Sequence, residues 1–129
     1  NITTMVLEEI SQLIEDCNVK RDVMVEHREK IHKMQKDLLK FAALRLPKDD
    51  LTDLEHYQNQ FHIQLINIHD LRHDLKLIQQ RLKTELHVHE DVSESALQKH
   101  SDISSQFETL EKLLEDLEGD FSEFLQRPH

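Results

Sequence analysis

The chain has 129 residues, of which 37% are hydrophobic and 33% are charged, and its formal net charge is −10. A single Gly and two Pro leave little material for tight turns, which argues against a sheet of several strands and rules out a collagen helix. One Cys rules out a disulfide scaffold, and the negative charge opposes binding to nucleic acid or anionic lipid.

The first segment, at about residues 3–45, has the apolar repeat of a long helix. Five residues recur at intervals of seven: Ile10, Cys17, Met24, Ile31 and Leu38. A companion series starts apolar and continues polar: Leu7, Ile14, Arg21, Arg28 and Gln35. Further apolar residues widen the stripe on both flanks, so we expect this helix to contact two neighbours.

The second segment, at about residues 50–88, follows Pro47 and has the cleaner repeat. Its main series has an interval of seven: Leu54, Phe61, Ile68, Leu75 and Leu82. A second set lies three residues after members of that series: Tyr57, Leu71 and Ile78. We expect Asp49 or Asp50 to cap the start of this helix, with a capping box of Thr52 and Glu55 as the alternative.

The third segment, at about residues 93–127, repeats over about four heptads. Its main series is Ala96, Ile103, Leu110, Leu117 and Phe124, and its companion series is His100, Phe107, Leu114 and Phe121. Ser93, or a capping box that begins at Asp91, is expected to cap the helix. We expect the helix to continue through Gly119, although Gly costs about 1 kcal/mol relative to Ala in a helix interior.

Three helices that each have one apolar face, joined by short connections, predict a single fold. Leu46-Pro47-Lys48-Asp49 is too short to let the second helix lie anywhere but against the first. The sequence therefore predicts an all-α fold, an elongated antiparallel three-helix bundle with up-down-up order and left-handed coiled-coil packing. A helical hairpin that swaps its third segment to another chain is the alternative. We expect residues 1–129 to form one domain, a fragment of a longer protein.

The ten histidines raise the question of a metal site. His69 and His73 are four residues apart on one helical face, a spacing that lets two imidazoles reach one ion. The core series directs this pair to solvent and the sequence places no third ligand, so we predict no metal site there or at His87 and His89. His100 occupies a core position, where we expect either a buried histidine that is hydrogen-bonded across the bundle or a histidine at the end of the bundle opposite the first connection.

Nothing in the sequence points to catalysis. The chain has no Gly-rich phosphate loop, and its paired carboxylates lie on solvated helix faces. Cys17 lies on the apolar stripe, where its thiol is expected to be inert. We therefore predict neither an enzyme nor a cofactor. A lone Cys indicates a reducing intracellular, cytoplasmic setting, and no apolar run approaches the about 20 residues of a membrane span.

Arg21, Arg28 and Gln35 are the candidate partner-binding residues, because polar side chains stand where an apolar seam is expected. In one interpretation their aliphatic stems cover the groove while their polar ends reach water. In the other, a further helix from a second copy or another protein packs there, and these residues set its register. The acidic stretch from Glu108 to Glu123 is a second surface that suits a basic partner.

The predicted architecture favours a protein–protein interaction or scaffolding module of a larger cytoskeletal, centrosomal or trafficking protein. The layout of three antiparallel heptad helices resembles a spectrin-type repeat, although the chain has longer helices and lacks the tryptophans of that family. The alternatives are a regulatory domain of vesicle-tethering or membrane-fusion machinery, resembling the N-terminal three-helix domains of syntaxins, and a homo-oligomerisation segment. The expected partners are proteins that offer a helix or a charged helix face. A second copy of the chain, which would give a homodimer, is one of these partners.

Overall fold

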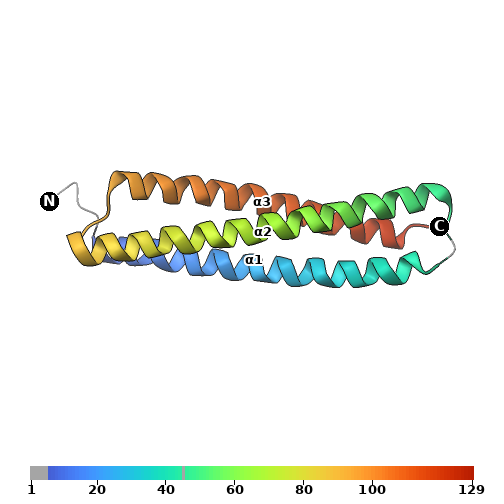
Figure 1. The fold of residues 1–129 in the computed structure, drawn as a ribbon, viewed down its shortest axis with the longest axis horizontal. Helices are drawn as coiled ribbons and strands as arrows, with labels where there is room; N and C mark the ends of the chain where they lie inside the picture. Colours follow the sequence, from blue (N-terminus) through green and yellow to red (C-terminus); the bar gives the residue numbers. More distant parts are fainter. Residues whose placement is uncertain (1–5, 45) are drawn as a thin grey trace.

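A computed structural model describes residues 6–44 and 46–129 as three long helices and no strand. They are α1 (Leu7–Ala42), α2 (Lys48–His89) and α3 (Glu94–Gln126). The helices lie side by side along one axis and alternate in direction, so the molecule is a rod (Figure 1). The predicted all-α, antiparallel three-helix bundle is confirmed.

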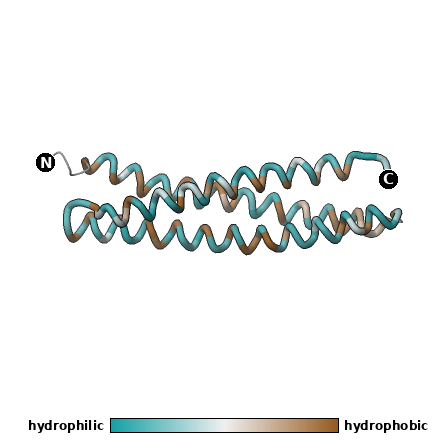
Figure 2. The backbone as a smooth tube through the Cα atoms, turned by 90° about the horizontal axis from the view of Figure 1, so that it is seen from above, coloured by the Kyte–Doolittle hydropathy of each residue, from teal (hydrophilic) through white to brown (hydrophobic). Residues whose placement is uncertain are grey.

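The heptad series form the core. Hydrophobic turns recur along each helix between hydrophilic ones (Figure 2). The buried residues of the main series include Ile10, Cys17, Met24, Ile31, Leu38, Leu54, Phe61, Ile68, Leu75, Leu82, Ala96, Ile103, Leu117 and Phe124. Leu110 is half-buried, and the α3 companions Phe107, Leu114 and Phe121 are buried beside it. The bundle thus hides one narrow stripe from each helix and exposes the remaining faces.

The predicted cap of the second helix is wrong, although its predicted start near residue 50 lies within two residues of the observed one. Helix α2 begins at Lys48 with Pro47 as its N-cap, and no side chain caps it. The hydroxyl of Thr52 donates to the carbonyl of Lys48 (3.3 Å) instead of accepting from the helix start. Asp50 is buried and accepts from His129. The fixed φ of proline suits a helix start, which explains why no acidic cap is needed.

The other helix ends agree more closely with the sequence. Helix α1 ends at Ala42, and the residues predicted for its extremes, 3–5 and 45, lie outside the described residues. Ser93 caps α3 as predicted, since its hydroxyl accepts from the Ala96 N–H (3.1 Å). Helix α3 continues through Gly119, where an added Cβ would meet nothing within 4 Å.

The α2–α3 connection is held by an acid of α2. Glu90 ends α2 in the left-handed conformation (φ 58°), and its N–H bonds the Leu86 carbonyl. Glu85 then accepts from the Ser93 N–H (2.7 Å) and from Arg81 Nε (2.8 Å). These hydrogen bonds lower the pKa of the Glu85 carboxyl to about 2, and the bond from the Ser93 N–H is the largest cause. Glu85 therefore fixes the position at which α3 begins.

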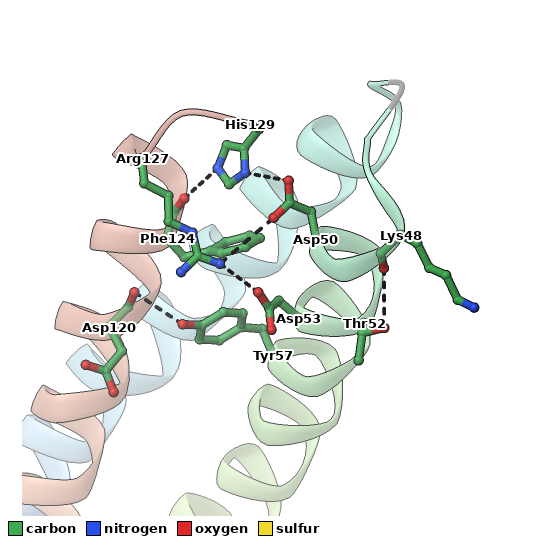
Figure 3. Close-up of polar contacts among 9 residues, drawn as sticks. All are labelled: Lys48, Asp50, Thr52, Asp53, Tyr57, Asp120, Phe124, Arg127 and His129. Atoms are coloured by element: carbon green, nitrogen blue, oxygen red, sulfur yellow. Dashed lines mark hydrogen bonds and ion pairs between the residues drawn. The ribbon is translucent and has the colours of Figure 1, made fainter.

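The opposite end of the rod is closed by aromatic rings and a polar clasp. Phe61 and Phe121 meet edge to face with centroids 5.0 Å apart, and Tyr57 packs on Phe121 at 5.1 Å. The Tyr57 hydroxyl donates to the Asp120 carbonyl (3.2 Å). As Figure 3 shows, Arg127 pairs with Asp53 (2.6 Å), and His129 Nδ1 lies 2.7 Å from Asp50. These contacts join the end of α3 to the start of α2.

Polar contacts also link α1 to α3. His27 is buried on α1, and its two ring nitrogens lie 3.3 Å from Glu111 and 3.3 Å from Glu118. His100 of α3 lies 3.3 Å from Asp16 of α1. It is half-buried and contacts a carboxylate across the bundle, but Nε2 makes no well-aligned hydrogen bond. His27, which the sequence did not single out, is thus the more deeply buried histidine of this interface.

Leu75 and Leu77 provide a matched test of the helix register. They are two residues apart on α2, and their exposed fractions are 1% and 50%. Leu75→Asp places an unpaired carboxylate in the core and is expected to cost more than about 4 kcal/mol, a large part of the about 5–15 kcal/mol that stabilises a domain, so its melting midpoint is expected to fall steeply. Leu77→Asp is expected to change stability by less than about 0.5 kcal/mol. Circular-dichroism melts measure both, and equal melts for the two variants would contradict this register.

Glu85→Gln tests the connection through its pH dependence. Because the folded pKa of Glu85, about 2, lies below its ordinary value of 4.5, ionised Glu85 stabilises the fold at neutral pH. That contribution is present above the ordinary value and declines as the pH falls from about 5 toward about 2. Urea unfolding is expected to show wild type more stable than Glu85→Gln at pH 7, with the difference shrinking by pH 3. A difference that stays constant over this range would contradict the assignment.

Candidate functional site: two surfaces between helices

The surface between α2 and α3 is hollowed along much of its length. Hollows of about 500 and 550 Å³ share the residues Thr109 and Leu113. A third hollow of about 240 Å³ shares Asp74 with the first. The three hollows lie in a row between residues 56–81 of α2 and 99–120 of α3, and this stretch of surface is here called the α2–α3 groove.

The α2–α3 groove has an apolar floor and an apolar edge. Leu71, Ile78 and Leu117 line it and are themselves part of the core. Leu77 of α2 and Leu113 of α3 also line it, but 50% and 41% of their surfaces remain exposed. The groove therefore presents leucines to solvent on both walls, as a surface for an apolar helix face does.

The charges along the groove are uneven. Its central hollow is lined by two acidic residues, Asp70 and Asp74, and by no basic residue. The adjacent hollow toward the aromatic end adds Asp116 and Asp120, with Lys112 beside them. The bases Arg81 and Lys99 occur only in the small third hollow, near the α2–α3 connection. Most of the groove thus has an acidic border.

The candidate residues Arg21, Arg28 and Gln35 lie on the other side of the rod, and all three are half-buried. Gln79 of α2 donates to the carbonyl of Ile14 (3.0 Å) and to Asn18 Oδ1 (2.7 Å). Since Ile14 belongs to the same heptad series as Arg21, Arg28 and Gln35, that series faces α2. The side chain of Gln35 makes a hydrogen bond one turn back along α1, where its Oε1 lies 3.2 Å from Nδ1 of His32.

Arg72 of α2 faces the same seam. It lies seven residues before Gln79 and is half-buried, so it meets the α1 series between Arg21 and Arg28. Burial lowers the pKa of Arg72, and the positive charges of Arg28 and Arg21 lower it further. Sequence reasoning missed Arg72, although the polar interruption of its own series (Gln58, Leu65, Arg72, Gln79 and Leu86) was a usable signal.

Three lysines of α1 have acidic partners. Lys30 lies 3.8 Å from Glu118 of α3, and Lys33 lies 3.1 Å from Asp37. Lys20 pairs with Asp16 (2.6 Å) and stands 5.3 Å from the ring centre of Phe107. Lys30 and Lys20 thus contact α3, whereas Lys33 pairs within α1.

The histidines considered as metal ligands are spread over the surface. His69, His73, His87 and His89 are all exposed. His69 has its own neighbour Asp70 at 3.5 Å. Within residues 6–44 and 46–129, no three or more His, Cys, Asp or Glu side chains gather as metal ligands would. The described part of the chain brings no third ligand to either pair.

Cys17 is fully buried, as expected for a residue of the main α1 series. Burial, assisted by the nearby charge of Asp16, raises the pKa of its thiol to about 11. Thiolate is the reactive form, so the folded protein is expected to react very slowly with thiol reagents at mildly alkaline pH.

A colorimetric thiol assay measures this reactivity. In the native protein the rate is expected to be at least about a hundredfold lower than in concentrated guanidinium chloride, since both the pKa and burial slow it. Denatured protein supplies the control, because all its thiol is accessible. Rapid stoichiometric labelling of the native protein would contradict the placement of Cys17.

Along the described residues, no helix combines the length and the apolar character that crossing a membrane requires. The chain matches no protein-family model, no curated protein and no solved structure. A function for this protein therefore rests on its own surfaces, the α2–α3 groove and the arginine seam.

Proposed function

We propose that the chain is a non-catalytic protein–protein interaction module that binds a helix of a partner protein in the α2–α3 groove. The observation that carries this proposal is that both helices expose a leucine along the groove: Leu77 of α2 lines the third hollow, and Leu113 of α3 lines the first two. A fourth helix lying there would cover both and extend the core packing of the bundle. Burial of apolar surface is worth about 25 cal/mol per Å², so this contact favours docking.

The partner that suits the groove is an amphipathic helix with a basic flank. Its apolar face would rest on Leu71, Leu77 and Leu113, while Lys or Arg residues beside that face would meet Asp70 and Asp74. Such opposite charges steer association and fix the register of a helix in its groove. A partner with an acidic flank is disfavoured, because it would meet these aspartates.

In the cell, such a module would act as a scaffolding segment of a larger intracellular protein of the cytoskeletal, centrosomal or trafficking type. The rod shape supports this role, because it separates the surfaces at its two ends (Figure 1). The resemblance in layout to spectrin-type repeats points the same way. We infer no reaction at the groove, because it is a shallow surface between two straight helices, whereas catalytic sites are typically enclosed.

The same groove favours a second candidate function. In the syntaxin-like three-helix domains that the layout resembles, a groove closes on a helix of the same protein and regulates its availability. If Leu77 and Leu113 bind such a segment, the chain is a regulatory domain rather than a scaffold. The bound helix has the same chemistry in both cases, and its origin distinguishes them.

A selection experiment tests the groove. A displayed library of amphipathic helical peptides is selected on the immobilised chain, and the enriched peptides are expected to have Lys or Arg beside their apolar face. Leu77→Asp combined with Leu113→Asp is expected to weaken binding of these peptides by about tenfold or more. Fluorescence anisotropy of a labelled peptide measures this loss.

Ile66→Asp is the matched control, since Ile66 is 50% exposed on α2 but lines none of the three hollows. It is expected to leave peptide affinity within about twofold of wild type. Enrichment of acidic peptides, or equal loss of affinity in Ile66→Asp, would overturn the proposal. Light scattering over a range of concentrations tests self-association, and a dimer broken by the two groove substitutions would replace the partner helix with a second copy.

A further inference from the structure

Three arginines meet where α1 and α2 pack. The hydrogen bonds of Gln79 to Ile14 and Asn18 set the register of the two helices. Because α1 and α2 run in opposite directions, seven residues back along α2 correspond to about seven residues forward along α1. Arg72 therefore lies level with the stretch between Arg21 and Arg28.

This cluster is incompletely compensated. Nε of Arg21 and Nε of Arg72 are buried and make no hydrogen bond within the described part of the chain. The charge of Asp22 acts on Arg72, and Arg28 lies 3.4 Å from Glu29, but that contact is exposed and therefore weak. Three guanidinium groups thus share this seam with buried donors left unpaired, in a protein whose net charge is −10.

The arrangement is unfavourable as a purely structural feature. Like charges that share a partly buried seam repel one another, and this repulsion, after burial, lowers the pKa of Arg72. Buried donors without acceptors add a further cost. A seam of leucines would avoid both costs. Each cost is removed when a multivalent anion sits among the three arginines.

We propose that Arg21, Arg28 and Arg72 form a binding site for a phosphoryl-class oxyanion on the α1–α2 seam. A guanidinium presents a planar fork of N–H donors that matches the oxygens of phosphate, and several forks can share one phosphoryl group. A doubly charged phosphoryl group offsets the excess cation of the cluster better than a single carboxylate does. The site lies on a different seam from the α2–α3 groove and is independent of the function proposed there.

The phosphoryl group has two sources, a free polyphosphate and a phosphorylated side chain of a partner protein. Sodium pyrophosphate serves as the first probe. A phosphoserine peptide serves as the second, with its unphosphorylated form beside it. Tighter binding of the phosphopeptide assigns the source to a partner, and tighter binding of pyrophosphate assigns it to a free anion, and both outcomes support the site.

Isothermal titration calorimetry of the whole chain at constant ionic strength measures binding of each probe. Arg72→Gln is expected to weaken pyrophosphate binding by about tenfold or more, because it removes the central guanidinium. The variant is expected to fold, with an unfolding midpoint equal to or above that of wild type, since it removes like-charge repulsion. A structural role alone would lower that midpoint.

Two controls separate a built site from general electrostatics. Lys83→Gln removes one exposed positive charge eleven residues farther along α2 and is expected to change the affinity by less than about twofold. Arg72→Lys keeps the charge but loses the fork, and is expected to bind more weakly than wild type. Binding of neither pyrophosphate nor the phosphopeptide would overturn the proposal. So would equal losses of affinity in Arg72→Gln and Lys83→Gln, or succinate binding as tightly as the better of the two probes.

Discussion

The structure depends on the burial of one narrow apolar stripe from each of three helices against the other two. Ile10, Met24, Phe61, Ile68 and Leu114 are almost fully covered, while most side chains that flank the stripes remain partly exposed. A stripe of this width hides only against partners of equal length, so the helices must lie along one another. At about 1.5 Å per residue the longest helix extends about 60 Å. The result is a rod with much surface and a shallow core, and its flanking residues decide what it can bind.

The three seams of the bundle are not equivalent, and the polar side chains explain the difference. The α1–α3 seam is closed by His27 between two glutamates and by Lys20 on Phe107. The α1–α2 seam is joined by the hydrogen bonds of Gln79. The α2–α3 seam is joined at its two ends, at Glu85 and at Tyr57, and is hollowed between them. A partner helix therefore has a natural place on one side of the rod and a charged patch on another.

The sequence predicts the core well because the seven-residue interval is a local property. The buried main series, the Ser93 cap and the passage of α3 through Gly119 all follow from spacing and helix propensity. The cap of α2 was mispredicted because Asp50 has a stronger tertiary role in the clasp with His129. Arg72 and His27 were missed for the same reason, since spacing assigns a face but not the residues that the neighbouring helix presents to it. The groove also depends on how closely two helices approach, which no single segment encodes.

A bundle of heptads is intrinsically ambiguous, because sliding one helix by seven residues, about 10 Å, places apolar side chains against apolar side chains again. His27 removes that ambiguity. It is held between Glu111 and Glu118, which are themselves seven residues apart, so one imidazole has an acid on either side. A slip in one direction would put Ser104 in place of one acid, and a slip in the other would put Leu125 there. His27 therefore adds to Glu85 at the connection: the hydrogen bond of Glu85 fixes where α3 begins, and the imidazole distinguishes the correct alignment of α1 and α3 from a shift of one heptad.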